Sequence, residues 1–179
     1  MPDPAHARTV AGPLGCAVLT VSDTRRGGDD VSGRRAAELA AAAGWRVVER
    51  AAAADDEGAI RSAVEALLGH SQVDVVILTG GTGVAPRDVT PEAVAPLLAR
   101  PLAGFGELFR QLSFAEIGPA AMLSRATAGI ALPPGGPAKA LFALPGSPAA
   151  VELAVSRLIL PAAEHLLAQA RRGAPPGAL

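Results

Sequence analysis

The stretch Val73-Asp74-Val75-Val76-Ile77-Leu78-Thr79-Gly80-Gly81-Thr82-Gly83 decides the fold of this 179-residue chain. Its first half is a β-branched apolar run that is typical of a buried strand, and its second half is a glycine-rich turn. A segment with helical signals begins near Pro91. A strand that ends in a glycine turn before a helix binds anions in open α/β sheets. Glycine permits a positive φ there, and the free N–H groups point at the ligand.

The same alternation of strand and helix extends along the chain in both directions. Ser32 is the expected N-cap of a helix that ends before Gly44, and the stretch after Pro101 that contains Gly104 to Arg110 is expected to be less regular. The apolar patterns predict strands at 16–21, 45–50, 73–79, 128–132 and 139–144, and helices at 32–43, 56–68, 91–98, 119–124 and 149–170.

This order of elements predicts an α/β fold with a mostly parallel sheet and helices on both of its faces. Ligands of such sheets bind beyond the carboxyl ends of the strands. The loops that follow predicted strands are polar, and we expect them to converge on one edge of the sheet; they lie around Ser22, Asp56, Gly80–Asp88 and Pro145–Ser147.

Composition limits the classes of function. Half of the residues are hydrophobic but only 3% are aromatic, so Ala, Leu, Val and Ile must form the core. The net charge of −1 predicts no nucleic-acid or membrane-surface partner, and no apolar window reaches the length of a membrane span. The single cysteine, Cys16, lies in an apolar run and is expected in the core of a cytoplasmic protein. We expect one domain over residues 14–170, with flexible tails at 1–13 and 171–179.

The glycine turn Gly80–Gly83 is not a known nucleotide motif on its own. It lacks the Gly-Lys-Ser/Thr ending of a Walker loop and the G-x-G-x-x-G spacing of a dinucleotide site. A tight connection without a ligand is therefore the alternative to a phosphate cradle. The position of the turn at a strand end, next to a polar cluster, favours the cradle.

Asp88 follows this turn, and helix capping does not account for it. Capping explains its neighbours, with Thr90 as N-cap, Pro91 at the first helical position and Glu92 near the positive helix end. A carboxylate beside an anion loop is expected when a cation joins the two, and Mg²⁺ typically takes one or two carboxylates plus substrate phosphates. Asp55 or Asp56 could supply a second carboxylate, with capping of the following helix as the alternative role.

Two further pairs of residues carry candidate binding groups. Ser147 can cap the last helix and also present a loop to an anion, while Ser124 and Arg125 offer a hydroxyl and a fixed positive charge. An Arg after a helix is also a common surface residue. The histidines are scattered, and we assign no metal or catalytic role to His6, His70 or His165.

These segments together resemble the MoaB/MogA family of molybdenum cofactor biosynthesis proteins, whose domain also occurs in gephyrin-like and MoeA-like proteins. The resemblance covers about residues 15–168, and the segment at 106–118 is similar to the MoaB branch in particular. The matching motifs are Thr20-Val21-Ser22-Asp23, Asp30-Val31-Ser32-Gly33, Asp56-Glu57, Thr79-Gly80-Gly81-Thr82-Gly83, Arg87-Asp88-Val89-Thr90-Pro91-Glu92-Ala93, Gly104-Phe105-Gly106-Glu107, Ser124-Arg125 and Leu144-Pro145-Gly146-Ser147-Pro148.

The resemblance implies a three-layer α/β/α sandwich, assembled as a trimer or hexamer, that binds molybdopterin. It further implies adenylylation of the terminal phosphate of molybdopterin with Mg-ATP, with Asp56 and Asp88 as catalytic and Mg²⁺-binding residues. The following Glu57 matches Asp56 to the family's acidic position, and Asp55 is the alternative. The implied binding residues are Ser22, Asp23, Thr79, Gly80, Gly81, Thr82, Gly83, Glu107, Ser124, Arg125, Pro145, Gly146 and Ser147.

A non-catalytic molybdopterin-binding or scaffold protein of the same pathway is the alternative function, because the same loops would bind the pterin without a reaction. Oligomerisation has an independent signal in the sequence. Phe105, Leu108, Phe109, Leu112 and Phe114 lie close together in a chain otherwise poor in aromatic residues, which favours either a core cluster or an interface.

Overall fold

The computed structural model describes residues 12–23 and 30–172, and their strands form one six-stranded sheet. The strand order is β2-β1-β3-β6-β5-β4, so the predicted strand before the glycine turn, β3, lies near the centre. Residues 1–11, 24–29 and 173–179, which include most of both predicted tails, lie outside the described residues. The strands are β1 (Gly15–Val21), β2 (Arg46–Ala53), β3 (Val75–Thr79), β4 (Arg100–Pro101), β5 (Thr127–Ala131) and β6 (Lys139–Leu144).

The sheet is mostly parallel, as the sequence predicts. β1 pairs in parallel with β2 and β3, and β3 pairs in parallel with β6. β5 runs antiparallel to both β6 and β4. Every residue of β1, β3 and β6 is buried, because helices cover both faces of these central strands.

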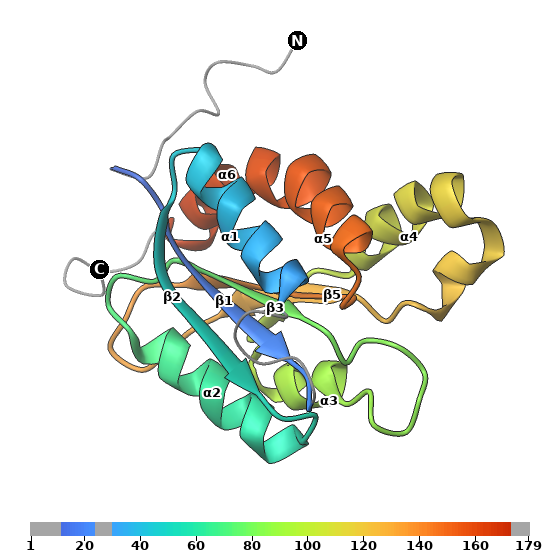
Figure 1. Ribbon diagram of the computed structural model, residues 1–179. Coiled ribbons are helices and arrows are strands. Elements are labelled where there is room, and N and C mark those ends of the chain that lie inside the picture. The colour runs from blue at the N-terminus through green and yellow to red at the C-terminus, as the bar shows by residue number, and fades with distance from the viewer. Residues whose placement is uncertain (1–11, 24–29, 173–179) are drawn as a thin grey trace, which may run out of the picture.

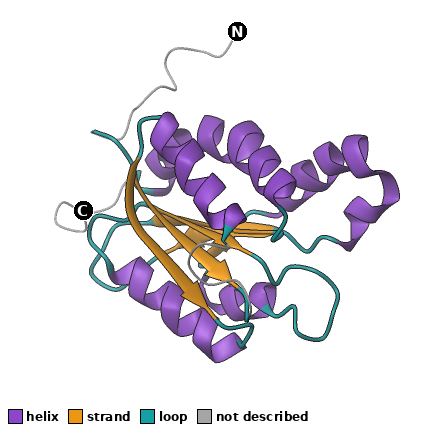
Figure 2. Ribbon diagram, in the orientation of Figure 1, coloured by secondary structure: helices purple, strands orange, loops and turns teal. Residues whose placement is uncertain are grey.

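Two helical layers enclose the sheet (Figures 1 and 2). One layer contains α1 (Val31–Ala42), α4 (Ala103–Ile117), α5 (Pro148–Ala154) and α6 (Leu160–Ala170), with a π-helical turn at Val155–Ile159 joining the last two. The other layer contains α2 (Glu57–Gly69) and α3 (Thr90–Val94). The expected three-layer α/β/α sandwich is confirmed.

Alternate residues of the central strands supply two separate cores. In β1, Cys16 and Val18 pack towards α1 and α5, whereas Ala17 and Leu19 pack towards α2. Cys16 is fully buried, and its burial raises the pKa of the thiol to about 12. The sequence-based placement of Cys16 in the core is therefore confirmed.

The N-cap of α1 is Asp30, so the expectation of Ser32 in that position was wrong. The helix begins at Val31, which puts the amide of Gly33 at the position where the Asp30 carboxylate accepts it at 2.8 Å. Ser32 instead donates its hydroxyl to the carbonyl of Gly146 at 2.8 Å. This bond ties the start of α1 to the loop after β6.

Residues 103–117 form the long helix α4, so the expectation of a less regular stretch was also wrong. Gly104 and Gly106 lower the intrinsic helix propensity of this segment. Packing compensates, because a Cβ on Gly106 would lie 2.8 Å from the carbonyl oxygen of Ala126, so the helix approaches the chain closely there. Phe105 also contacts Phe142 edge-on, with ring centroids 5.3 Å apart.

The other differences concern the ends and types of short elements. The predicted helix at 91–98 is α3 followed by a 3₁₀ turn at Ala95–Leu97, and the predicted helix at 119–124 is a 3₁₀ segment at Gly118–Leu123. The two-residue strand β4 was not predicted. No helix within the described ranges combines the length and apolar character that a membrane span requires.

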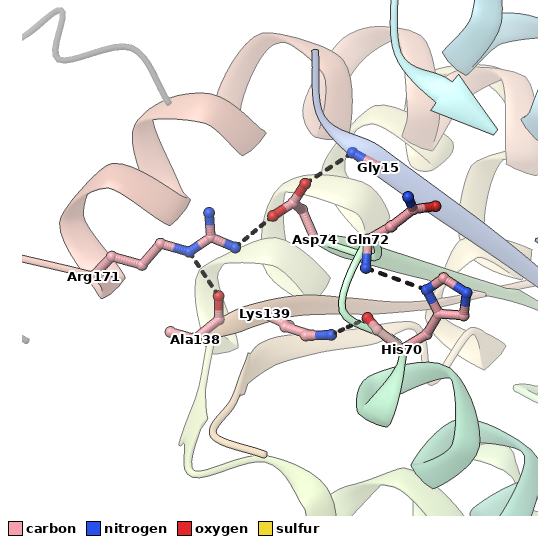
Figure 3. A network of polar contacts seen from close by, with 7 residues as sticks. All are labelled: Gly15, His70, Gln72, Asp74, Ala138, Lys139 and Arg171. Atoms are coloured by element: carbon pink, nitrogen blue, oxygen red, sulfur yellow. Dashed lines mark hydrogen bonds and ion pairs between the residues drawn. The ribbon is translucent and has the colours of Figure 1, made fainter. Parts of the chain in front are cut away.

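A polar network fastens the amino-terminal edge of the sheet (Figure 3). The carboxylate of Asp74 accepts the amide of Gly15 at 2.8 Å and the guanidinium of Arg171 at 2.7 Å. Arg171 also donates to the carbonyl of Ala138 at 2.9 Å, so the first residue of the predicted C-terminal tail is anchored. Burial lowers the pKa of Lys139, whose ammonium donates to the carbonyl of His70 at 2.6 Å.

We expect Asp74→Ala to lower the free energy of unfolding by about 3 kcal/mol, because it leaves the largely buried Arg171 without its ionic partner. Denaturant unfolding monitored by circular dichroism measures this loss. Glu152→Ala, which removes the partner of Arg35 at the protein surface, is the control and should cost much less. Equal losses in the two variants would contradict a special role for the edge network.

Candidate functional site

The candidate site lies at the carboxyl-terminal edge of the sheet, opposite the Asp74 network. β1, β3 and β6 end side by side there, at Val21, Thr79 and Leu144. The amide of Gly80 donates to the carbonyl of Leu144 at 2.9 Å, which fixes the glycine turn to the end of β6. The predicted convergence of the strand-end loops is therefore present in the fold.

The turn after β3 requires two consecutive glycines. Gly80 has a φ of +106° and Gly81 a φ of +66°. A Cβ on Gly80 would lie 2.3 Å from the carbonyl oxygen of Val21, and a Cβ on Gly81 would lie 2.3 Å from the hydroxyl of Thr90. Both the backbone conformation and the space therefore exclude larger residues.

Thr90 fastens this turn to α3 rather than capping the helix, so its predicted role as N-cap was wrong. Thr90 is the first helical residue, and Val89 occupies the cap position without a side-chain bond. The Thr90 hydroxyl donates to the carbonyl of Gly80 at 2.9 Å, and the Thr90 amide donates to the carbonyl of Gly81 at 3.0 Å. The carbonyl groups of the turn are thereby turned towards α3.

The amide groups of the turn remain available. Among the described residues, the N–H groups of Gly81, Thr82 and Gly83 have no hydrogen-bond partner. Successive unpaired amides in a glycine turn form a concave donor site that suits an anion such as a phosphate.

Two adjoining cavities open on this turn and share Gly80, Gly81, Asp88 and Gly146. The smaller cavity has a volume of about 160 Å³ and a polar lining. Its other lining residues are Thr20, Val21, Ser22, Asp23, Asp30, Ser32, Asp55, Thr79 and Arg87.

The larger of the two cavities has a volume of about 540 Å³, which is in the range of small-molecule sites. Apolar residues of α4 and the following 3₁₀ segment form one wall. The lining includes Thr82, Gly83, Phe109, Ser113, Ile117, Ala121, Ser124, Pro145 and Ser147. A small polar cavity and a larger cavity of mixed lining thus meet at the glycine turn.

A separate cavity of about 660 Å³ lies between α1 and α5, away from the strand ends. Arg35 and Glu152 line it and pair with each other at 2.6 Å. It contains no glycine turn and none of the predicted site residues. We therefore place the candidate site at the strand ends, although the cavity between α1 and α5 has a larger volume than either cavity at the glycine turn.

Thr79 brings an unsatisfied hydroxyl to the floor of the smaller cavity. The residue is 1% exposed, and its Oγ1 has no hydrogen-bond partner. Its neighbour on β1, Thr20, donates instead to the carboxylate of Asp30 at 2.8 Å. A buried hydroxyl without a partner is costly, which indicates that a ligand or a water completes this pocket.

Asp88 lies against the glycine turn, as predicted. Its Oδ2 accepts the amide of Ala85 at 2.9 Å, and a Cβ on Gly83 would lie 2.6 Å from the same oxygen. Asp88 lines both cavities, and its neighbour Arg87 lines the smaller one. Sequence reasoning did not include Arg87 among the site residues, although it adjoins Asp88 in the motif.

The structure separates the roles of Asp55 and Asp56. Asp55 lines the smaller cavity and exchanges two bonds with Asp23, from the Asp55 amide to Oδ1 of Asp23 at 3.0 Å and from the Asp23 amide to Oδ2 of Asp55 at 3.1 Å. Asp56 is the N-cap of α2 and accepts the amide of Ala59 at 2.8 Å. The cavity therefore receives Asp55 rather than the Asp56 that alignment favoured.

Two other predicted binding residues do not line these cavities. Glu107 lies on the exposed side of α4, opposite the buried residues Phe105 and Phe109. The guanidinium of Arg125 donates to the carbonyl of Gly83 at 2.7 Å, to the carbonyl of Asp88 and to the carboxylate of Glu92. Arg125 therefore binds the backbone of residues 83–88 and does not line either cavity.

The loop after β6 completes the site. Ser147 is the N-cap of α5, accepting the amide of Ala150 at 3.2 Å, and it also lines the larger cavity with Pro145 and Gly146. The two roles predicted for Ser147 are thus compatible. Ser32 and Asp30 also line the smaller cavity but were not predicted as site residues, since Ser32 was expected to cap the helix and Asp30 was given no role.

Comparison with protein families matches residues 17–165 to a family described as "Probable molybdopterin binding domain". Among curated proteins, the chain is 41% identical over 168 residues to molybdenum cofactor biosynthesis protein B of Bacillus subtilis, covering 93% of this chain and 96% of that protein.

Solved structures give the same result. A crystal structure of molybdenum cofactor biosynthesis protein B matches with a TM-score of 0.85 at 42% identity, over 92% of this chain and 99% of the other. The tungsten cofactor synthesizing protein MoaB from Pyrococcus furiosus matches with a TM-score of 0.76 at 35% identity, over 89% and 98%.

The unsatisfied hydroxyl gives a prediction about stability. Thr79→Val replaces that hydroxyl with a methyl group of similar size and should raise the free energy of unfolding by about 1 kcal/mol. Thr79→Ser keeps the hydroxyl and removes the methyl group, and should lower it by about 1 kcal/mol. Denaturant titration in ligand-free buffer measures both. A destabilised Thr79→Val variant would mean that the hydroxyl already has a partner.

Proposed function

Because the chain belongs to the MoaB family of molybdenum cofactor biosynthesis proteins, we propose that it binds molybdopterin and adenylylates the terminal phosphate of this pterin with Mg-ATP. The observation that carries the proposal is the meeting of two cavities at one glycine turn beside Asp88. Two phosphate-bearing substrates can meet at such a turn, because residues with unpaired amides line both cavities.

The proposed step is a nucleotidyl transfer. An oxygen of the pterin's phosphate attacks the α-phosphorus of ATP, the new P–O bond forms, and the bond from that phosphorus to the bridging oxygen breaks. Pyrophosphate leaves with the electron pair of the broken bond. The substrate's own phosphate is the nucleophile, so the protein contributes positioning and charge neutralisation.

The polar groups around the smaller cavity suit this task. The amide of Gly81 and the hydroxyl of Thr79 would donate hydrogen bonds to phosphate oxygens there, and Arg87 adds a positive charge; the amides of Thr82 and Gly83 continue the turn along the larger cavity. The mixed lining of the larger cavity, which includes Ser124 and Phe109, suits the pterin ring.

The acidic residues fit a Mg²⁺ ion that is shared with phosphates. Within the described ranges, no three acidic, histidine or cysteine side chains gather as a complete metal site. Mg²⁺ takes one or two carboxylates and completes its shell with phosphate oxygens and water, which matches Asp88 and Asp55 at the smaller cavity. When bound, the ion would neutralise the charge that develops on the phosphates.

Transfer assays on single variants test this assignment. Purified chain with molybdopterin and Mg-ATP should release pyrophosphate and adenylylated molybdopterin. Asp88→Asn and Asp55→Asn should each lower kcat by roughly 100-fold, the loss typical when one electrostatic contact to a developing charge is removed. Asp56→Asn, which keeps an acceptor at the N-cap of α2, should retain most activity.

Two outcomes would change the assignment. A large loss in Asp56→Asn with normal Asp55→Asn would restore the alignment-based choice of Asp56. Pterin binding by the wild type without any product would make the chain a binding or scaffold member of the pathway.

We also propose that the chain assembles as a homo-oligomer, a trimer or a hexamer, through α4 and the 3₁₀ segment after it. Several large apolar side chains in these two segments are more than half exposed, with Met122 reaching 75%: Leu108, Phe114, Ile117, Met122 and Leu123. Phe105 and Phe109 of the same helix are core residues, so only one side of the predicted aromatic cluster is free. An exposed group of large apolar side chains is typical of an interface.

Light scattering of the purified chain tests this surface. The wild type should have three or six times the mass of one chain. Phe114→Glu should shift the mass towards a monomer, because a charge would be buried at the interface. Leu132→Glu, a substitution of another exposed apolar residue directly after β5 (50% exposed, against 60% for Phe114), is the control and should leave the mass unchanged. A monomeric wild type contradicts the proposal.

A further inference from the structure

The segment that leads from the glycine turn towards α3, residues 83–88, lies at the surface. We call it the Asp88 loop. Residues 84–87 are exposed, and Val84 reaches 65%. Inside the loop, the amide of Asp88 donates to the carbonyl of Ala85 at 2.9 Å, and the amide of Ala85 donates to the Asp88 carboxylate. Such a loop does not pack into the core, so contacts from outside must hold Asp88 at the cavity.

Arg125 supplies these contacts at both ends of the loop. Its amide donates to the carbonyl of Thr82 at 2.8 Å, and its Nε donates to the carbonyl of Gly83 at 2.7 Å. Its Nη2 donates to the carbonyl of Asp88. One guanidinium thus joins the first and last residues of the Asp88 loop.

Glu92 holds the same guanidinium from α3. The Glu92 carboxylate accepts a bond from Nη1 of Arg125, and the hydrogen bond from Arg125 lowers the pKa of Glu92. Three of the five N–H groups of Arg125 are therefore directed to three different acceptors. A planar, rigid fork can make these contacts together, whereas a lysine ammonium acts as a point charge.

We propose that Arg125 and Glu92 are positioning residues that close the Asp88 loop and hold the Asp88 carboxylate against the glycine turn. Arg125 acts on the reaction through Asp88 and not through contact with the pterin. The catalytic part of this inference rests on the proposed adenylyl transfer. The closure of the loop is a property of the free chain and can be tested without any substrate.

The pair of Arg35 and Glu152 provides a matched comparison. Its side chains are 38% and 50% exposed, against 36% and 49% for Arg125 and Glu92. Arg35 also binds its partner through two nitrogens, at 2.6 Å and 2.8 Å. The difference is that Arg125 also donates to two loop carbonyls, so only its replacement should release a loop.

Hydrogen exchange of the free protein tests loop closure. In Arg125→Lys, the amides of Ala85 and Asp88 should exchange about tenfold faster than in the wild type, as expected when charge-assisted bonds to the loop are lost. Glu92→Gln keeps an acceptor for Arg125 and should give a smaller increase than Glu92→Ala. Arg35→Lys should leave these amides unchanged. Unchanged exchange at Ala85 and Asp88 in Arg125→Lys overturns the proposal.

A double-mutant cycle tests the route through Asp88. Arg125→Lys should lower kcat for adenylyl transfer about tenfold or more, with KM for both substrates nearly unchanged, because a misplaced catalytic group affects turnover first. In an Asp88→Asn background the same change should have no further effect. If the kcat losses of the two single variants instead multiply in the double variant, Arg125 contacts substrate directly, and the proposal is overturned. A wild type without transfer activity would reject the proposed function, and hydrogen exchange would still decide the loop closure.

Discussion

The arrangement of the site depends on the contact of Gly80 and Gly81 with three neighbouring elements. Their positive φ values turn the chain sharply after β3. The turn packs so closely that a Cβ on Gly80 would lie 2.3 Å from the carbonyl oxygen of Val21, and a Cβ on Gly81 would lie 2.3 Å from the hydroxyl of Thr90. The carbonyls of the turn are bonded to Thr90, and the amide of Gly80 is bonded to Leu144. The amides of Gly81, Thr82 and Gly83 have no partner among the described residues, and these residues line the cavities, which supports the proposed anion site.

The stabilising polar network and the candidate site lie at opposite edges of the sheet. At the amino-terminal edge, Asp74 and Arg171 are paired and largely buried, so the network locks β1, β3 and the end of α6 together. At the carboxyl-terminal edge, Thr79 carries a buried hydroxyl without a partner, and exposed loops carry the charged groups. Polar groups left unsatisfied in the free chain are typical of a site whose ligand completes them.

The fold could be predicted from the sequence because buried parallel strands are continuous apolar runs and glycine turns punctuate them, as at Val73–Gly83. The helix α4 could not be predicted in this way. Gly106 lowers the local helix propensity, and the close packing of this glycine against the carbonyl of Ala126 is a tertiary contact that the local sequence does not reveal. In the candidate site, the sequence predicted which strand-end loops come together, but it did not predict which side chains of these loops reach the cavities. Asp55 and Asp56 are adjacent, yet only Asp55 lines the cavity, and Arg125 is directed to backbone carbonyls.

A crystal structure of the chain with Mg²⁺ and a non-hydrolysable ATP analogue would show whether the glycine turn binds phosphate. We expect phosphate oxygens within hydrogen-bonding distance of the amides of Gly81 to Gly83 and of the Thr79 hydroxyl, with the metal ion bound by Asp88. A nucleotide bound instead in the cavity between α1 and α5, with the glycine turn free of phosphate, would contradict this expectation.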